Sequence, residues 1–474
     1  MVFSSTIFTF LFLPIVLMVY YLSKEQYRNN ILLIASLLFY AYGEPWFVIL
    51  MMISIIINWG LALAIDNCKN KLLLRRLLLF FAVLINIGVL FIFKYYDFSV
   101  TIFNMIFGSS LKILGIGLPI GISFFTFQAI SYIVDIYRGE EKAQKNLMKV
   151  GLYISLFPQL IAGPIVRYKT VAEQIEDRKT TADMFAQGIK RFLCGFCKKI
   201  ILANNLAVVA EEIFSCQSYD SLPMGYAWIG AICFSLQIFY DFSGYSDMAI
   251  GLGKMFGFEF QENFNYPYIS KSITEFWRRW HMSLGQWFRD YVYIPLGGSR
   301  SGVIRHILNM FVVWVLTGLW HGANFTFIAW GLIYFVGLVI EKYIIKPEKR
   351  KNVIGKVLWQ IITLIIIIFA WVLFNSEGLK EGVQYWLAMV GVYYHNPMWG
   401  DQYYFIVKEN LVYIIVSLIF TVPIAPYMQK RIGKTTGGKT IMELMHIFVY
   451  MIGFIWAISF LILGSHNPFI YFNF

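Results

Sequence analysis

Charged residues are scarce in this chain, and the motifs of several common enzyme classes do not occur in it. Only 14% of the 474 residues are Asp, Glu, Lys or Arg, while 59% are hydrophobic, an apolar share above that of soluble domains. The sequence has no Walker A motif, no G-x-G-x-x-G and no G-x-S-x-G. These absences argue against P-loop chemistry, dinucleotide binding and a serine-hydrolase elbow.

Cysteine is also rare, with five residues and therefore an odd number. This count gives no disulfide framework and favours reduced thiols. Cys194 and Cys197 form a C-x-x-C, but no βαβ pattern surrounds them and they lie in a basic segment. We interpret this pair as packing rather than redox chemistry. No two histidines have metal-ligand spacing on one helix, so we expect no metal site.

Long apolar runs indicate a polytopic, all-α membrane protein. Val353 to Phe374 is almost entirely apolar, and about twenty such residues cross the hydrocarbon layer as a helix. The formal charge of +12 comes from Lys and Arg in short loops between apolar runs. This positive-inside pattern favours a membrane over nucleic acid as the partner. We expect about eleven spans plus re-entrant or surface helices, in a single membrane-embedded domain over residues 1–474.

Charge also predicts the orientation of the loops. The basic segment from Arg138 to Lys149 is expected in the cytoplasm, and the loop from Ser215 to Pro223, which lacks Lys and Arg, is expected outside. Gly151 to Tyr168 contains two prolines and should break into half-segments whose backbone is buried in protein or lines a wet cavity. An inward-facing polar face is predicted on the preceding helix, either as hydrogen-bonding contact between helices or as a substrate path. Its residues are Ser123, Thr126, Gln128, Ser131 and Asp135.

The stretch from Phe276 to Asn324 combines polar and aromatic residues in an apolar context. Because Arg278, Arg279 and Arg289 cannot all face lipid, we expect Phe276 to Pro295 to lie along the cytoplasmic face or to re-enter from it. His281 lies in this part, and His321 ends a hydrophobic run. Polar groups in such positions are candidate functional residues. The remaining histidines are predicted near membrane edges or loops, in solvent: His306, His395, His446 and His466.

Seven long motifs follow one another along nearly the whole chain. They are LPIGISFFTFQAISYIVDIYRG, FPQLIAGPIVRY, YDFSGYSDMAIGLGKMFGFEFQENFNYPY, EFWRRWHMSLGQWFRDY, IPLGGSRSG, LTGLWHGANF and PFIYFNF. Together they resemble the membrane-bound O-acyltransferase family, in particular its bacterial branch, which contains the alginate O-acetyltransferase membrane subunit and the D-alanyl transfer protein of teichoic acid modification.

The resemblance implies helices around a funnel or tunnel, in a bacterial cytoplasmic membrane. It places the family's central histidine on His321 and its second histidine on His281. It also implies transfer of an acetyl group from a cytoplasmic thioester donor, acetyl-CoA, to a glycan hydroxyl. A partner of the SGNH-hydrolase type outside the cytoplasm would complete the O-acetylation of an exopolysaccharide or cell-envelope glycan, and no bound cofactor is expected.

The residues fit this chemistry. A neutral imidazole at His321 can take the proton of an attacking hydroxyl, which contributes about 10²- to 10⁴-fold. Trp320 or Asn324, its neighbours in sequence, could stabilise the oxyanion. His281 either orients a substrate or anchors the re-entrant helix. The arginines Arg278, Arg279 and Arg289 suit either the phosphates of a CoA-type donor or anionic lipid headgroups.

Two alternative functions remain open. One is D-alanyl transfer to teichoic acid from an acyl carrier protein. The other is a channel or flippase that moves a polymer or lipid without covalent chemistry. The sequence shows no internal repeat, which weighs against the common transporter folds.

Overall fold

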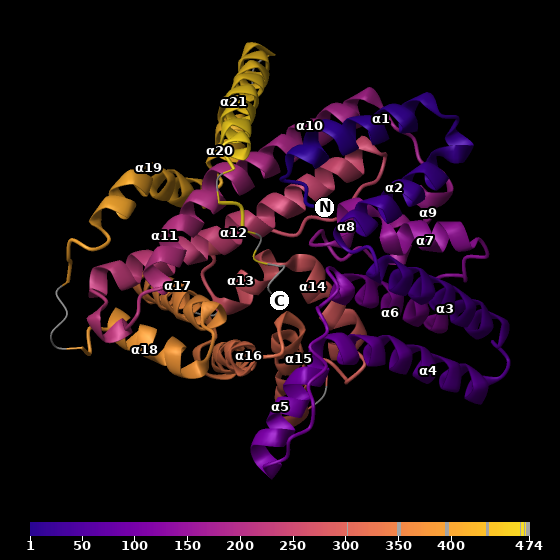
Figure 1. The fold of residues 1–474 in the computed structure, drawn as a ribbon, viewed down its shortest axis with the longest axis horizontal. Coiled ribbons are helices and arrows are strands. Elements are labelled where there is room, and N and C mark those ends of the chain that lie inside the picture. Colours follow the sequence, from indigo (N-terminus) through magenta and orange to yellow (C-terminus); the bar gives the residue numbers. More distant parts are fainter. Residues whose placement is uncertain are drawn as a thin grey trace. The chain divides into compact units, whose positions relative to one another are not determined.

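Helices are the regular secondary structure of the part of the chain that the structure describes. The computed structural model describes residues 1–300, 302–347, 352–393, 398–432, 436–464, 466–468 and 470. No strand occurs among them (Figure 1), in agreement with the predicted all-α class. These residues divide into two compact units, residues 1–192 with 246–261 and residues 193–245 with 262–474. The predicted single domain is neither supported nor opposed by this division and stays a prediction.

The first unit contains the N-terminal helices, of which α3, α4 and α6 pack against one another (Figure 1). The turn at residues 44–46 joins α2 to α3. The bounds are α1 Leu13–Leu22, α2 Arg28–Gly43, α3 Phe47–Asn67, α4 Leu72–Leu90, α5 Tyr96–Phe107, α6 Ile122–Arg138, α7 Leu147–Ser155, α8 Phe157–Leu160, α9 Tyr168–Glu176 and most of α10 Ala182–Cys197.

Helix α6 carries the predicted polar face, and the structure buries it. The helix lies between two glycines with positive φ, Gly121 at 76° and Gly139 at 77°, a conformation that glycine adopts without steric cost. The predicted inward orientation is therefore confirmed. The polar side chains in question are all buried: Ser123, Thr126, Gln128, Ser131 and Asp135.

The predicted break after Gly151 is also confirmed. Helix α7 ends at Ser155, α8 covers only Phe157–Leu160, and the chain is not helical again until Tyr168. Pro158 lies within the first turn of α8, where its missing N–H has no helical partner to lose. The residues from Val150 to Val166 are all buried, so protein surrounds the irregular backbone, as a membrane segment requires.

The second unit holds all the site residues that the sequence predicts. Here α15 and α16 form a closely packed pair (Figure 1). The bounds are α11 Asn204–Phe214, most of α12 Met224–Met255, α13 Ile273–Arg279, α14 Met282–Phe288, α15 Val303–His321, α16 Phe325–Val339, α17 Val353–Asn375, α18 Leu379–Met389, α19 Tyr404–Phe420, α20 Ile424–Ile432 and α21 Thr436–Ile462. Helices α13 and α14 are too short to span a membrane, which confirms that this stretch is not a transmembrane helix.

A buried ion pair joins two helical segments of this unit. Lys199, in the π-helical turn Lys198–Ala203 before α11, lies 2.7 Å from Asp241 of α12, and both side chains are at most 2% exposed. The C-terminal backbone completes this pair, because Ile470 N donates to the Asp241 carboxylate at 3.0 Å and Lys199 Nζ donates to the carbonyl of Pro468. Two charges at this depth are tolerated only when paired in this way.

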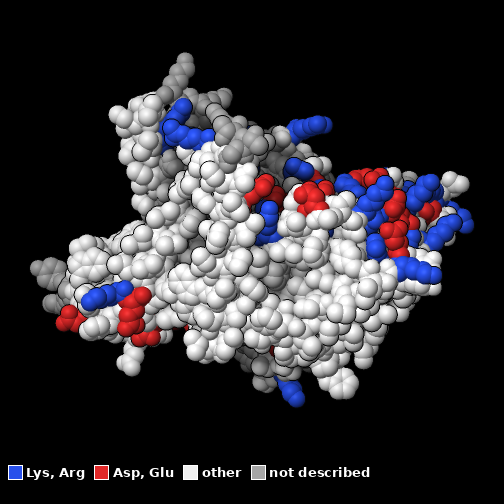
Figure 2. All heavy atoms as spheres, turned by 90° about the horizontal axis from the view of Figure 1, so that it is seen from above, with Lys and Arg blue, Asp and Glu red and all other residues white. Residues whose placement is uncertain are grey.

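Several helices have the length and composition of membrane spans. Within the described residues seven helices qualify by these criteria, or eight if the bent pair α19 and α20 is one span. This supports a multi-pass membrane protein, and the predicted number of eleven stays a prediction. Figure 2 shows a broad surface without charged side chains beside a group of mixed acidic and basic residues.

Candidate active site

His281 lies in the tight connection between α13 and α14. Ser272 caps α13 by accepting a hydrogen bond from Glu275 N at 3.0 Å, the arrangement expected of an S-x-x-E sequence. The helix ends at Arg279, and His281 adopts φ 44° and ψ 52° immediately before α14. A residue other than glycine rarely has positive φ, and such residues concentrate at functional sites.

The His281 ring is buried among aromatic side chains. It is 1% exposed, and the edge of Phe242 contacts it at a centroid distance of 4.6 Å. Nδ1 lies 3.3 Å from Asn263 Oδ1, whereas Nε2 has no hydrogen-bond partner among the described residues. His281 lies outside the membrane-spanning helices, and burial lowers its pKa to about 3. The imidazole is therefore neutral at any ordinary pH.

His321 is the last residue of α15, where α15 and α16 approach closely. Gly331 makes this approach possible, because a Cβ there would lie 2.5 Å from the Trp314 carbonyl oxygen; a Cβ at Gly318 would collide with the Phe327 carbonyl. The His321 side chain is 4% exposed. Trp330 and Phe374 present their rings to it at centroid distances of 4.9 and 5.1 Å.

Trp320 connects the two histidines. Its ring centroid is 5.7 Å from that of His281 and 5.0 Å from that of His321. The two histidines are forty residues apart in sequence, and the fold brings both rings against one indole. Three of the predicted site residues thus form one cluster.

Several buried hydrogen-bond donors lie next to this cluster. The indole N–H of Trp330, the indole N–H of Trp277 and the hydroxyl of Tyr334 have no hydrogen-bond partner among the described residues. The three rings contact one another, with centroid distances from 4.8 to 5.5 Å. Because buried polar groups are nearly always hydrogen-bonded, this arrangement suits a polar ligand or water beside His321.

Asn324 has a different environment from the predicted one. Its Oδ1 caps α16 by accepting a hydrogen bond from Thr326 N at 3.1 Å, and its Nδ2 donates to the Glu377 carbonyl at 2.8 Å. Both polar groups of the side chain therefore stabilise local structure. A role in stabilising an oxyanion stays a prediction that competes with these contacts.

A comparison with known protein families identifies the family of this chain. A family model described as the membrane-bound O-acyltransferase family matches residues 140–376, a range that includes His281, Trp320 and His321. The chain belongs to this family.

Proteins with related names are similar in sequence to this chain over 54% to 83% of its length. A protein of Pseudomonas aeruginosa named "Probable alginate O-acetylase AlgI" is 45% identical over 393 residues, which cover 82% of this chain and 75% of that protein. A Helicobacter pylori "Peptidoglycan O-acetyltransferase" is 34% identical over 425 residues, covering 83% and 80%. A Bacillus subtilis "Teichoic acid D-alanyltransferase" is 29% identical over 266 residues, covering 54% and 67%.

The three arginines predicted in this O-acyltransferase do not form one group with the histidines. Arg279 pairs with Glu275 at 2.8 Å and donates to the Asn265 carbonyl at 3.0 Å. Arg289 pairs with Asp290 at 2.8 Å and is 59% exposed, and Arg278 is exposed as well. Binding to phosphates or headgroups stays a prediction for all three.

Sequence reasoning missed four residues of this cluster and misplaced one histidine. Asn263, Phe242, Trp330 and Phe374 contact the two catalytic candidates, and only the presence of Asn263 and Phe242 within family-like motifs could have indicated them.

His306, which we predicted in solvent, is 6% exposed, and its Nδ1 lies 2.5 Å from the Tyr343 hydroxyl. The prediction is wrong because Tyr343, in the π-helical turn Ile340–Ile345, packs against the His306 ring. His466 lies 2.7 Å from Glu211 and is 46% exposed, and His395 falls outside the described residues.

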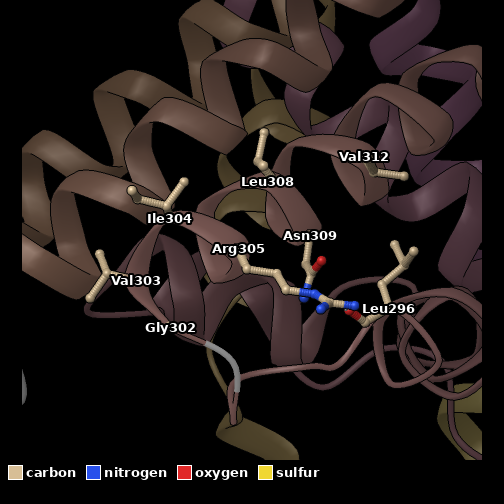
Figure 3. A pocket seen from close by; sticks show the side chains of 8 residues that line it. All are labelled: Leu296, Gly302, Val303, Ile304, Arg305, Leu308, Asn309 and Val312. Atoms are coloured by element: carbon tan, nitrogen blue, oxygen red, sulfur yellow. The ribbon is translucent and has the colours of Figure 1, made fainter.

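A separate groove lies over the first half of α15. It has a volume of about 780 Å³ and is lined by residues between Leu296 and Val312 (Figure 3). Arg305 and Asn309 bind the adjoining loop, donating to the carbonyls of Leu296 and Gly298. Since Asn309 precedes His321 by twelve residues, about 18 Å of helix separates this groove from the histidine cluster.

Proposed function

We propose that this chain is a membrane O-acetyltransferase that delivers acetyl groups from acetyl-CoA to a hydroxyl of an exopolysaccharide or cell-envelope glycan. The membership in the O-acyltransferase family, together with relatives named for glycan O-acetylation, supports this function. The observation that carries it at the level of residues is the buried cluster of His281, Trp320 and His321, beside donors that have no hydrogen-bond partner within the described part of the chain.

His321 acts as the general base in this proposal. Its imidazole takes the proton of the acceptor hydroxyl while the hydroxyl oxygen attacks the thioester carbonyl carbon. The tetrahedral intermediate then collapses, the carbon–sulfur bond breaks, and the proton passes to the departing thiolate. The indole N–H of Trp330 is available to the carbonyl oxygen as negative charge develops on it, and one such donor typically contributes 10²- to 10³-fold.

The remaining assignments complete the route of the acetyl group. The enzyme resides in the cytoplasmic membrane, acetyl-CoA approaches from the cytoplasm, and Arg278, Arg279 and Arg289 bind its phosphates. The hydroxyl that first accepts the acetyl group reaches the cluster from the other side of the membrane. An SGNH-type partner outside the cytoplasm then passes this acetyl group from the first acceptor to the glycan. D-alanyl transfer is the second candidate, supported by the similarity to the teichoic acid enzyme over 54% of the chain.

Substitution of His321 tests the proposal. We expect His321→Ala to lower base-releasable acetate on envelope glycan about 10²- to 10⁴-fold in cells that depend on this gene product. His446→Ala is the matched control, because it makes the same change on α21, which carries none of the cluster residues. Both variants must reach the membrane in wild-type amounts.

The same cells and the purified protein discriminate between the candidates. With labelled donors, transfer from acetyl-CoA supports the proposal, whereas transfer only from a D-alanyl carrier protein supports the second candidate. Unchanged acetylation in His321→Ala would remove His321 as the base. A wild-type protein that transfers neither group but moves polymer or lipid would identify a transporter.

A further inference from the structure

Asn263 organises the backbone on both sides of His281. The residue is fully buried. Its carbonyl accepts a hydrogen bond from Met282 N at 3.0 Å, and its Oδ1 accepts from Ser283 N at 3.1 Å and from Ser283 Oγ at 2.8 Å. Two residues on, Asn265 N donates to the Arg279 carbonyl at 2.9 Å. The segment 263–265 therefore runs alongside residues 279–283 and holds the connection between α13 and α14.

These contacts determine the orientation of the Asn263 amide. Oxygen and nitrogen of an amide are hard to tell apart by shape, and the assignment follows from the hydrogen-bond partners. The Ser283 N–H can only donate, so the atom that faces it must be the amide oxygen. With the amide reversed, two N–H donors would face each other in a buried environment.

The amide orientation in turn determines the tautomer of His281. Its Nδ1 lies 3.3 Å from the same Asn263 oxygen, and an oxygen with no hydrogen can only accept. Nδ1 must therefore carry the ring proton, which leaves a lone pair on Nε2 in the neutral ring. That Nε2 is buried without a hydrogen-bond partner among the described residues, in a ring that is 1% exposed.

The surroundings of Nε2 suit a hydrogen-bond acceptor better than a base. Phe242 and Trp320 pack against the ring, with centroid distances of 4.6 and 5.7 Å, and no described cation or carboxylate pairs with it. Burial lowers the His281 pKa to about 3, far below the range in which a general base works well. An acceptor at Nε2 would still bind and orient a hydroxyl.

We propose that Asn263 is a positioning residue that holds His281 in the Nδ1–H tautomer, so that Nε2 accepts a hydrogen bond from a second donor group of the acceptor and orients the reacting hydroxyl toward His321 for transfer. The inference rests on the function proposed above. No bond is made or broken at His281, and the hydroxyl proton leaves through His321. The left-handed backbone of His281 follows from the same contacts, since Met282 and Ser283 are both bound to Asn263.

The first test needs no activity. In full-length protein labelled with ¹⁵N-histidine, the His281 signals are identified as those lost in His281→Gln. We expect a protonated Nδ1 and an unprotonated Nε2 at neutral pH. A wild-type protein with the proton on Nε2 overturns the proposal, whatever the protein catalyses.

The second test separates positioning from general stability. We expect Asn263→Ala to lower kcat for acetyl transfer about 10- to 100-fold, as loss of an orienting hydrogen bond does, while KM for acetyl-CoA stays within about twofold, and to mix the two tautomers. Asn265→Ala is the matched control, because its side chain is exposed and only its backbone holds the loop. Asn263→Ala with the kcat and spectrum of Asn265→Ala overturns the proposal.

Asn263→Asp gives a conservative variant that keeps an acceptor oxygen for Ser283 and His281. We expect it to retain the proton on Nδ1 and more activity than Asn263→Ala. It also serves if Asn263→Ala does not accumulate in the membrane: an unprotonated Nδ1 in Asn263→Asp then overturns the proposal. A wild-type enzyme that transfers no acetyl group defeats the proposed function instead, and leaves the tautomer measurement standing.

Discussion

At the scale of single residues, Asn324 is close to His321 in the sequence, but its side chain makes its hydrogen bonds elsewhere. The sequence places this asparagine three positions after His321, which suggested a donor to the oxyanion. In the structure α15 ends at His321 and the chain turns, so Asn324 begins the next helix. Its side chain accepts a hydrogen bond from Thr326 N and donates one to the Glu377 carbonyl. Trp330, nine positions after His321 and on the next helix, contacts the imidazole instead.

We expect Asn324→Ala to lower the stability of the folded protein by about 1 kcal/mol, which is the typical cost of removing a helix cap. The rate of acetyl transfer at a temperature where the protein is folded should remain near that of the wild type. Thermal unfolding in detergent and transfer kinetics measure the two effects. Asn324→Asp keeps the cap oxygen and should lose less stability. A large loss of rate without loss of stability would restore the oxyanion role.

The cluster was only partly predictable from single residues. A histidine in an apolar run is conspicuous because its burial is costly, so His321 and His281 could be found without coordinates. The role of Asn263 could not be derived in this way, because one asparagine in a loop has many uses and its role here depends on a contact across eighteen residues. The indole N–H groups of Trp277 and Trp330 were equally hidden, since nothing in a sequence shows which buried donors have partners.

At the scale of elements, a distant carboxylate fixes the start of α13. Glu341 lies in the π-helical turn Ile340–Ile345 after α16 and is 2% exposed. Its two oxygens accept from Ile273 N at 2.6 Å, from Thr274 N at 2.8 Å and from Thr274 Oγ1 at 2.7 Å. Trp359 Nε1 of α17 donates to it at 2.9 Å. This carboxylate therefore ties α13, which leads to His281, to the helices that surround His321.

Glu341→Ala should destabilise the protein strongly. It leaves four donors without an acceptor, of which two are buried and the two of Thr274 are partly buried, and each unsatisfied buried donor costs about 1–3 kcal/mol. We expect a loss of at least about 3 kcal/mol, seen as a lower midpoint of thermal unfolding in detergent. Glu341→Gln keeps one acceptor oxygen and should lose less. The exposed Glu409 on α19 gives the control, and a Glu341→Ala protein as stable as Glu409→Ala would contradict the assigned role.

Helix boundaries were predicted well where they depend on residues close together in the sequence. Prolines and glycines predicted the break between α7 and α9, and arginines in an aromatic context predicted that α13 and α14 do not span the membrane. The cap from Glu341 is a contact over 68 residues, and no local pattern distinguishes it from a charge at a membrane edge. The same applies to the buried pair of Lys199 and Asp241, because no local pattern shows that these two residues meet.

At the scale of the whole molecule, hydropathy and charge predict a membrane protein and its orientation, but not the number of crossings. Seven or eight helices among the described residues have the length and composition of spans, while several buried helices are shorter or more polar. A helix that is surrounded by protein need not be as apolar as one surrounded by lipid. A hydropathy criterion therefore identifies only some of the helices that cross a membrane. The orientation of the loops is a separate prediction, because it rests on Lys and Arg alone.

Labelling of introduced cysteines tests that orientation. In a variant whose five cysteines are replaced by serine or alanine, Lys145→Cys and Gln217→Cys place one thiol in each of two exposed loops. The positive-inside pattern predicts Lys145 in the cytoplasm and Gln217 outside. A membrane-impermeant maleimide should therefore label Gln217→Cys in intact spheroplasts and Lys145→Cys only after permeabilisation. The reverse result would contradict the predicted side of both loops, whereas labelling of both thiols in sealed spheroplasts would contradict the cytoplasmic position of Lys145.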